Sequence, residues 1–138
     1  MFLGEYKPNV TEGARVALPK KLRDQIDGNS VILSRGFEKC LFGYDRRDWL
    51  KEAEKQVNLP ISDPKVRTLK RYMFSGAVDV ELDTQGRLVI PAPLKDYAGL
   101  SGEVVVVGAG DHFEIWDFDA WEKNLSEIEK SLSTKDTI

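Results

Sequence analysis

Two nine-residue stretches, DTQGRLVIP at residues 83–91 and TEGARVALP at residues 11–19, are versions of one pattern, and this pattern decides the fold. Each stretch is a polar turn of four residues, followed by an arginine that opens a short alternating strand. Pro19 and Pro91 end these strands, because proline has no N–H to donate to a β-ladder. The same prolines suit the first turn of a short helix. The pattern therefore predicts a turn, a strand and a short helix in each stretch.

The two stretches belong to a tandem repeat with an offset of 72 residues. Aligned without a gap, the copies share ten identities over about fifty positions, which indicates a duplication. The identical pairs are Met1/Met73, Phe2/Phe74, Gly4/Gly76, Arg15/Arg87, Pro19/Pro91, Leu22/Leu94, Asp24/Asp96, Gly36/Gly108, Asp45/Asp117 and Trp49/Trp121. Apolar character is shared at Val16/Leu88, Leu18/Ile90, Ile32/Val104 and Leu41/Phe113. We therefore expect the two halves to fold alike.

Each copy predicts the same order of elements: strand, polar turn, strand, short helix, β-hairpin and longer helix. In the first copy these cover residues 6–10, 11–14, 15–18, 20–26, 30–34 with 40–44, and 45–57. In the second copy they cover residues 78–82, 83–86, 87–90, 92–97, 103–107 with 113–116, and 117–132. Asp45 and Asp117 are predicted N-caps of the longer helices. Asp63 and Pro64 predict a further helix at residues 65–73, between the copies.

One four-stranded module of roughly forty residues is too small to bury a stable core by itself. We therefore expect the two modules to pair about a pseudo-twofold axis, with interdigitated strands and a shared core. The predicted class is α+β, mainly β. The predicted boundaries are residues 1–58 for the first module with its helix, residues 59–72 for a linker and basic helix, and residues 73–138 for the second module with a C-terminal helix.

The distribution of charge is uneven along a chain whose net charge is −3. Residues 1–49 carry a net charge of +2 and residues 50–75 one of +3, whereas residues 76–138 carry −8. A positive first half could face phosphates, and a chance arrangement of solvated surface charge is the other interpretation. No run of residues is long and apolar enough to span a membrane, and the N-terminus lacks an apolar signal core. We therefore expect a cytoplasmic protein, in which the single cysteine, Cys40, is a small buried residue.

The pattern Asp83-x-x-x-Arg87-x-x-Ile90-Pro91, between a strand and a short helix, resembles the motif of SpoVT/AbrB-like swapped-hairpin DNA-binding domains. Two tandem copies, the opening Met1-Phe2-x-Gly4 and the segment 114–117 (EIWD) are together similar to the MraZ family along nearly the whole chain. The resemblance implies a pseudo-twofold, double-ψ-like β-barrel with flanking helices.

The same resemblance implies a bacterial transcriptional regulator of the division and cell-wall gene cluster. Such a protein binds short direct repeats in double-stranded promoter DNA, including its own promoter, and associates with the nucleoid. It assembles with itself into a homo-octamer or larger ring. No cofactor, membrane partner or small-molecule substrate is expected.

The first copy departs from the family motif in its loop. The motif has an aspartate four residues before the arginine; the second copy keeps it as Asp83, but the first has Thr11. Ala14 stands where glycine usually precedes the arginine, as Gly86 does in the second copy, and Gly13 replaces a frequent lysine. The first loop is therefore less basic than the family pattern predicts.

The two arginines have different predicted partners. An arginine can fork onto guanine or clamp a phosphate, or it can pair with a nearby carboxylate and hold the loop closed. For Arg87 we favour the structural pairing with Asp83, with DNA contact as the alternative. For Arg15, in the positive half, we favour DNA contact, with neutralisation by Glu12 as the alternative.

The remaining basic residues are candidate phosphate contacts that would set position without reading sequence. Lys7 lies near Arg15 in the sequence. Lys20, Lys21 and Arg23 follow Pro19 at the start of a short helix, and each of these three is equally well explained as a solvated cation on the helix surface. The basic helix at residues 65–73 is either a DNA-facing stripe or a solvated face. Asp83, Gly86, Pro19 and Pro91 are the predicted structural residues of the motif. The three tryptophans, which are Trp49, Trp116 and Trp121, are predicted core or subunit contacts.

The sequence offers little for an enzyme, a catalytic residue or a metal site. His112 is interpreted as a surface turn histidine, and no Cys/His cluster has metal-ligand spacing. Two other functions compete with promoter binding. One is an AbrB-type, antitoxin-like regulator that holds a partner protein through its C-terminal helix. The other is a ring-forming scaffold with weak DNA binding.

Overall fold

A computed structural model of the chain describes residues 1–133, which form five helices and nine short strands. The elements of the first copy are β1 (Glu5–Tyr6), β2 (Val10–Thr11), β3 (Arg15–Ala17), α1 (Lys20–Arg23), β4 (Ser30–Arg35), β5 (Leu41–Tyr44) and α2 (Arg46–Val57). Helix α3 (Pro64–Ser75) connects the copies. The second copy contains β6 (Val78–Glu81), β7 (Arg87–Val89), α4 (Ala92–Ala98), β8 (Val104–Gly108), β9 (Phe113–Asp117) and α5 (Phe118–Leu132). The order of elements predicted from the repeat is confirmed except at residues 6–10, where two strands, β1 and β2, replace the single strand expected.

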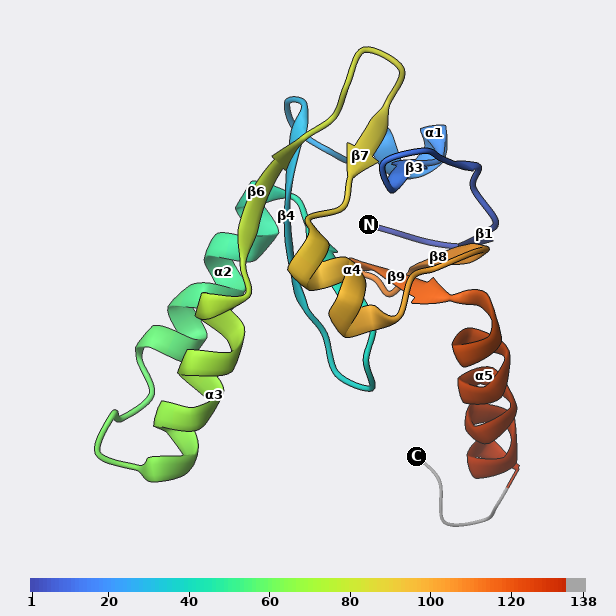
Figure 1. Cartoon of the computed structure of the whole chain (residues 1–138). Coiled ribbons are helices and arrows are strands. Elements are labelled where there is room, and N and C mark those ends of the chain that lie inside the picture. Colours follow the sequence, from blue (N-terminus) through green and yellow to red (C-terminus); the bar gives the residue numbers. More distant parts are fainter. Residues whose placement is uncertain (134–138) are drawn as a thin grey trace.

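The strands form two antiparallel sheets, which gives the mixed helix-and-strand fold shown in Figure 1. The larger sheet has the order β1-β8-β9-β5-β4-β6, and the smaller has the order β2-β3-β7. The described residues contain no closed barrel, so the double-ψ-like barrel expected from the resemblance is not found. One physical reason is that β2, β3 and β7 are only two or three residues long and are bounded by Pro8, Pro19 and Pro91. Among the described residues, an isolated bridge between Leu82, which follows β6, and Leu88 of β7 links the two sheets, but no continuous ladder closes them into a barrel.

The two copies exchange strands about a pseudo-twofold axis. In β3–β7 the central pair is Val16 opposite Leu88, and in β5–β9 it is Phe42 opposite Glu114. The partners in both pairs are 72 residues apart, so each is a residue facing its own counterpart. The first strand of each copy also completes the hairpin of the other copy, as β1 pairs with β8 and β6 pairs with β4. The predicted interdigitation of the two modules is therefore confirmed.

The register corrects the alignment of the copies at one hairpin. Tyr6 faces Val106 in β1–β8, whereas its counterpart Val78 faces Leu33 in β4–β6. Leu33 therefore corresponds to Val106, which is 73 residues away, and both side chains are fully buried. The second copy has one extra residue before β8 and one fewer in the turn that follows it. The ungapped pairings are accordingly wrong for Ile32/Val104 and Gly36/Gly108.

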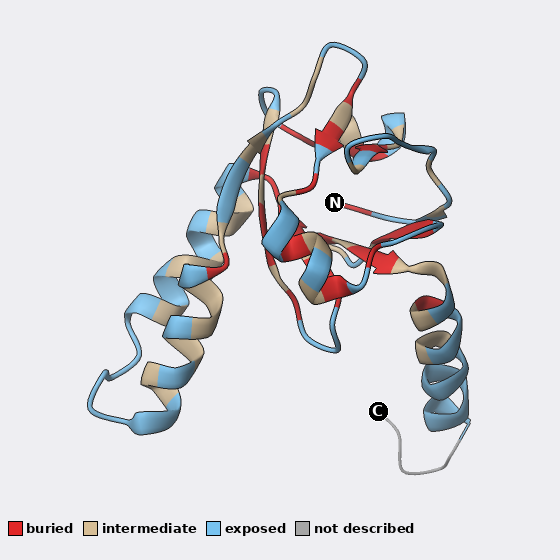
Figure 2. Cartoon of the chain, in the orientation of Figure 1, coloured by how far each residue is buried: buried red, intermediate tan, exposed pale blue. Residues whose placement is uncertain are grey.

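Both copies contribute to one core, which lies between the two sheets (Figure 2). Its central aliphatic side chains come from matching strands and short helices: Val16, Leu18, Leu22, Val31, Leu33 and Leu41 from the first copy, and Leu88, Ile90, Leu94, Val104, Val106 and Ile115 from the second. A second cluster on the other face of the large sheet contains Cys40, Val105, Trp116 and Trp121. The burial of Cys40 and the core positions of Trp116 and Trp121 are as predicted. The shared core explains why neither module is closed by itself.

The helix caps confirm two predictions and correct one. Asp117 accepts a hydrogen bond from the Ala120 N–H at 3.1 Å, and Asp63 accepts one from the Lys65 N–H at 2.9 Å. Asp45 occupies the N-cap position of α2, but its side chain makes no cap bond. The Asp45 carboxylate is fully buried, and it accepts instead from the backbone N–H of Asp27 and from Nε of Arg47. Asp45 thus ties α2 to the turn before β4.

Within residues 1–133, none of the helices combines the length and the apolar character needed to cross a membrane.

Candidate nucleic-acid interface

The loop of the second copy, residues 83–86, is closed by its aspartate. One oxygen of Asp83, Oδ1, accepts from the backbone N–H groups of Gln85 at 2.8 Å and Arg87 at 2.9 Å. The other oxygen, Oδ2, accepts from Nε of Arg87 at 2.7 Å. Chief among the causes that lower the pKa of Asp83 is the bond from the Arg87 backbone, which the guanidinium reinforces. The guanidinium of Arg87 is therefore held by its own loop, in agreement with the structural pairing favoured above.

The loop of the first copy, residues 11–14, lacks this lock. Its arginine, Arg15, donates one hydrogen bond from Nη1 to the backbone carbonyl of Glu12, at 2.9 Å. No carboxylate within residues 1–133 forms an ion pair with Arg15, so Glu12 contributes its carbonyl and not its side-chain charge. Arg15 is exposed, whereas the side chain of Arg87 is only 27% exposed. The first loop therefore presents a guanidinium whose charge is available to a ligand.

The residue before the arginine is left-handed in both loops, but its identity differs. Gly86 has a φ of +75°, and its counterpart Ala14 has a φ of +56°. Left-handed backbone is free of steric cost for glycine but costs an alanine about 1–2 kcal/mol. The preceding Gly13 also has a positive φ, of +78°, whereas its counterpart Gln85 does not. Ala14 is therefore a strained residue directly before the exposed arginine.

Each loop is anchored by the other copy. The carbonyl of Ala14 accepts from the Ile90 N–H at 3.0 Å, and the carbonyl of Gly86 accepts from the Leu18 N–H at 3.0 Å. These two bonds are counterparts across the pseudo-twofold axis. Pro91 and Pro19 directly follow the donor residues and turn the chain into α4 and α1. The position of Arg15 is thus fixed by the second copy, which is how a rigid scaffold presents a binding loop.

Both arginines project from the same face of the small sheet. In the β3–β7 pair, Val16 and Leu88 are buried, so the residues on either side of them point away from the core. Arg15 lies opposite Val89, which is 45% exposed, and Arg87 lies opposite Ala17. We call this side, made of Thr11, Arg15, Ala17, Arg87 and Val89, the outer face of the small sheet. This face carries the guanidinium of Arg15, which has no carboxylate partner within residues 1–133, and that of Arg87, which Asp83 holds.

The three predicted phosphate-binding lysines lie in different surroundings. Lys20 forms an exposed ion pair with Asp24 at 3.0 Å, a contact that solvent and salt screen strongly. Lys21 is exposed and lies beside the N-terminal residues. The ammonium of Lys7 lies 4.1 Å from the centre of the Phe118 ring, at the start of α5. The structure therefore brings none of them into contact with Arg15.

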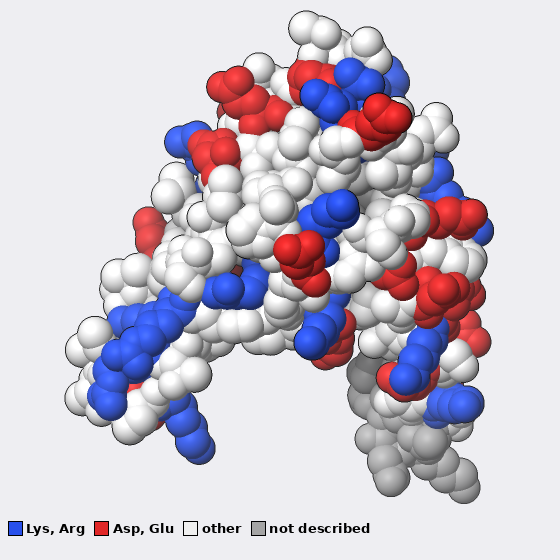
Figure 3. Space-filling model, in the orientation of Figure 1, with Lys and Arg blue, Asp and Glu red and all other residues white. Residues whose placement is uncertain are grey.

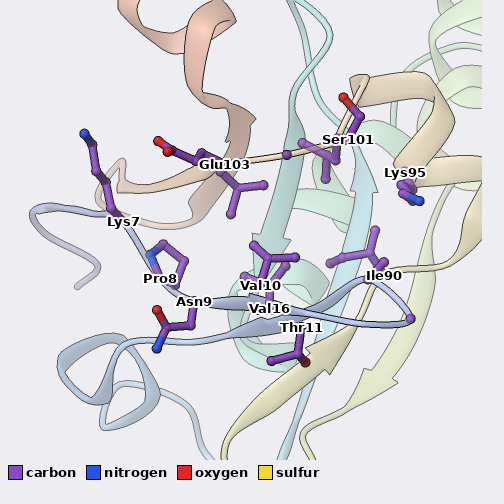
Figure 4. Close-up of a pocket in the computed structure, with 15 residues that line it drawn as sticks. Lys7, Pro8, Asn9, Val10, Thr11, Val16, Ile90, Lys95, Ser101 and Glu103 are labelled. Atoms are coloured by element: carbon purple, nitrogen blue, oxygen red, sulfur yellow. The ribbon is translucent and has the colours of Figure 1, made fainter.

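A groove of 860 Å³ opens beside the first loop (Figure 4). Its two sides are residues 7–14 and residues 100–104. In the second copy the matching strand stays in its sheet, because Val80 pairs with Val31 of β4. Its counterpart Pro8 has no N–H to offer, so β1 ends at Tyr6 and the chain crosses to β3. A single proline therefore separates the first loop from the large sheet.

Two cations lie against the loops: Arg23, which was a candidate phosphate contact, and Lys95, which escaped the sequence interpretation. Arg23 donates from Nε to the Leu18 carbonyl at 2.9 Å and packs over Gly86, where an added Cβ would meet its side chain at 2.7 Å. Its counterpart 72 residues on, Lys95, lines the groove together with Gly13 and Ala14. Each loop is thus flanked by a cation from the other copy. The pairing of Arg23 with Lys95 in the repeat could have shown this, because the positive charge is kept although the residue type differs.

His112 lies in the turn between β8 and β9, as expected from the sequence, but its side chain is not on the surface. Its side chain is only 16% exposed, and its ring nitrogens lie 2.8 Å from carboxylate oxygens of Asp111 and Glu114. Burial opposes the charged form, but the hydrogen bonds to Glu114 and Asp111 outweigh burial and raise the pKa of His112. The imidazole packs against Phe42, 4.5 Å between ring centres. The imidazole of His112 therefore packs against the paired strands β5 and β9.

The basic segment of α3 also serves the fold in part. Arg67 donates to the carbonyls of Ile61 and Ser62, and Lys70 donates to the carbonyls of Val57 and Leu59. These bonds close the turn between α2 and α3. Lys65 and Arg71 remain exposed. No group of three or more potential metal ligands is found among residues 1–133.

Comparison with known proteins gives consistent matches over the chain. The family model described as "MraZ protein, putative antitoxin-like" matches residues 1–72 and again residues 73–137. A protein of Roseiflexus sp. (strain RS-1) is 40% identical over 133 residues, covering 96% of this chain and 92% of the relative. Proteins of Halothermothrix orenii and Micrococcus luteus are each 40% identical as well, covering 95% and 99% of this chain and 91% and 94% of the relatives. All three relatives bear the name "Transcriptional regulator MraZ".

Proposed function

The chain belongs to the MraZ family of transcriptional regulators, and from that premise we propose that it binds double-stranded promoter DNA through its first loop. The observation that carries the proposal is the exposed guanidinium of Arg15, which has no carboxylate partner within residues 1–133. In this proposal Arg15 forks onto a base edge or a phosphate. Arg87 supports the second loop and contacts DNA in a lesser role.

Assembly is part of the proposed mechanism, because one subunit offers few contacts. The chain carries a net charge of −3, and most of its acidic residues lie in the second half. Several subunits that engage several repeats raise the apparent affinity by orders of magnitude if the spacing fits. We therefore propose a ring of eight or more copies that reads short direct repeats. Its proposed targets are promoters of the division and cell-wall gene cluster, and its proposed location is the cytoplasm, in association with the nucleoid.

The remaining lysines would support this contact rather than define it. Lys7, Lys20 and Lys21 are proposed to approach phosphates, which fixes position but reads no sequence. Lys95, which shares the groove with the first loop, adds positive charge on the same side as Gly13 and Ala14. No cofactor or small-molecule substrate enters the proposal.

The test is a salt series of gel shifts on DNA from immediately upstream of the gene. We expect a repeat-specific shift whose log affinity falls linearly with log salt, because lysine and arginine release counterions from phosphates. DNA with scrambled repeats of the same composition is the control. Equal shifts with the native and the scrambled DNA at every salt concentration would contradict the proposal.

A second function is favoured by one observation on α5. The last two turns of this helix expose Ile128 and Leu132, and the family description includes an antitoxin-like role. An AbrB-type regulator could hold a partner protein on such a helix. A ring scaffold with weak DNA binding is the remaining alternative. It gains support if the assembly is intact and no repeat-specific shift occurs at any salt concentration.

A further inference from the structure

Two helical arms extend from the same side of the β-sheets (Figure 1). We call the α2–α3 hairpin, residues 46–75, the paired arm, and α5, residues 118–132, the single arm. The arms are counterparts, because α2 and α5 occupy the same place in the two copies, with Trp49 matching Trp121. Both arms are largely exposed along their length (Figure 2). They differ in whether a second helix accompanies them.

In the paired arm, α3 covers one face of α2. The rings of Trp49 on α2 and Phe74 on α3 meet edge to face, with 6.0 Å between their centres. The ammonium of Lys70 donates to the Val57 carbonyl at 3.2 Å and to the Leu59 carbonyl at 2.9 Å, which joins α3 to the end of α2. The face of α2 that carries Trp49 is therefore supported within the chain.

The single arm has no such companion within residues 1–133. Its apolar residues recur at helical spacing along one stripe: Trp121, Leu125, Ile128 and Leu132. The first two pack on the second core cluster, but Ile128 is 38% exposed and Leu132 is 53% exposed. A helix of this length is marginal in water unless its apolar face is packed. Among residues 1–133, no helix covers Ile128 and Leu132 in the way that α3 covers α2.

The paired arm offers a surface that complements the single arm. Leu50 and Val57 of α2 are 55% and 60% exposed, and Ile61 at the tip of the hairpin is 66% exposed. Residues 64–75, which form α3, contain four basic residues and no acidic one. Residues 118–132, which form α5, contain four acidic and two basic residues. Figure 3 shows lysine and arginine gathered along the paired arm.

We propose that the single arm of one copy docks on the paired arm of the next copy, and this rests on the assembly in the proposed function. Ile128 and Leu132 cover apolar residues of the paired arm. Glu122 and Glu129, which flank the stripe on α5, face the exposed Lys65 and Arg71 of α3. Each copy carries one surface of each kind, so the contact is head to tail. A head-to-tail contact repeats from copy to copy until it closes into a ring.

The test uses two variants, each of which disrupts the docking surface of one arm and leaves the other arm unchanged. Leu132→Asp with Ile128→Asp alters only the single arm, and Lys65→Glu with Arg71→Glu alters only the paired arm. All four positions are at least one-third exposed or lie on an open helix face, so the core is untouched. By light scattering we expect each variant alone to fall to the mass of one 15.6 kDa chain. Lys123→Glu with Lys130→Glu, on the other side of α5, is the matched control and should leave the assembly unchanged.

The decisive step is to mix the two variants in equal amounts. Each then contributes its one intact surface, so a head-to-tail contact predicts a one-to-one complex with twice the mass of the chain and no further growth. Circular dichroism of each variant alone should match that of the wild type, which separates loss of contact from loss of fold. Restoring opposite charge within one chain, with Glu122→Lys and Glu129→Lys added to Lys65→Glu and Arg71→Glu, should restore assembly.

The outcomes separate this contact from the proposed function. If the wild type assembles and both variants still do, or if the mixture stays monomeric, the arm contact is wrong while DNA binding by the ring stands. If the wild type itself is a monomer, both the ring and the contact are wrong. Gel shifts of the monomeric variants, which keep Arg15, then report on DNA binding independently.

Discussion

The two loops occupy equivalent places in the two copies but hold their arginines differently. In the second copy, Asp83 accepts three hydrogen bonds, and the side chain of Arg87 is one of its donors. In the first copy, Thr11 occupies the position of Asp83, and Arg15 bonds only a backbone carbonyl. The duplication therefore allows one loop to serve the fold while the other keeps a free cation. The two loops therefore differ in the group that accepts from the arginine side chain, a carboxylate in one and a backbone carbonyl in the other, and not in the arginine itself.

The surroundings extend the same contrast. The strand before the second loop stays in the large sheet, whereas Pro8 releases the strand before the first loop and leaves a groove beneath it. Gly86 adopts left-handed backbone without cost, whereas Ala14 is strained there. The first loop is thus the less stable of the two, as is common for binding loops.

The largest expected difference is in DNA affinity. Arg15→Ala should weaken repeat-specific binding roughly 5- to 160-fold for each engaged subunit, because one good base contact is worth roughly 1–3 kcal/mol. Arg87→Ala should weaken it much less. Gel shifts or fluorescence anisotropy at one fixed salt concentration would measure both, with light scattering to show that each variant still assembles. A larger loss for Arg87→Ala would reverse the assigned roles of the two copies.

The next largest effect is on stability at the second loop. Asp83→Ala leaves two backbone N–H groups and one guanidinium without their acceptor, so we expect the melting temperature to fall by roughly 3–6 °C. Thr11→Ala, the matched change in the first loop, should shift it by less than about 1 °C. Differential scanning fluorimetry measures both. Equal shifts would mean that the aspartate is not what sets the two loops apart.

The strained residue gives a smaller effect of opposite sign in the two copies. Ala14→Gly should raise the free energy of unfolding by about 1 kcal/mol, because glycine adopts a φ of +56° without steric cost. Gly86→Ala should lower it by about 1–2 kcal/mol, since it adds the same strain and a Cβ against the Arg23 side chain. Urea unfolding checks both values. A loss of stability in Ala14→Gly would show that the first loop is not strained.

The smallest expected difference is in the response to pH. The pKa of Asp83 is lowered in the folded state, so its contribution to stability is present above the unfolded pKa and is lost as the pH falls through the folded pKa. The wild type should therefore exceed Asp83→Asn in stability at pH 7, and the gap should close in acid below both pKa values. Urea midpoints at several pH values measure the gap. A stability difference between the wild type and Asp83→Asn that stays constant with pH would show that the charge of Asp83 does not cause it.

The sequence predicted the repeat, most of the order of elements and the ion pair of Arg87 with Asp83. It succeeded because these features depend on local pattern: alternation in residues 87–90, the prolines that end strands, and an aspartate four residues before an arginine. The exchange of strands was also foreseen, because a module of this size cannot bury a core alone.

What the sequence missed depends on packing between distant residues. An ungapped repeat would place Ser34 opposite Val78. The one-residue shift that places Leu33 there instead is visible only in the register of the strands. The carboxylate of Asp45 was expected to cap a helix, but burial turned it toward Asp27 and Arg47. The barrel expected from the resemblance did not form within residues 1–133. His112 was assigned to the surface, because nothing local shows that Phe42 and Glu114 enclose it.

The most direct test of the central claim is site-specific crosslinking from the two loops to promoter DNA. Glu12→Cys and Gln85→Cys each place one accessible thiol in a loop, while Cys40 is fully buried and burial raises the pKa of its thiol, so a photoreactive maleimide labels the new residue. We predict that the label at residue 12 crosslinks to repeat DNA and that the label at residue 85 crosslinks at least about tenfold less, in keeping with a free and a locked arginine. Equal crosslinking from both loops, or crosslinking from residue 85 alone, would contradict the account.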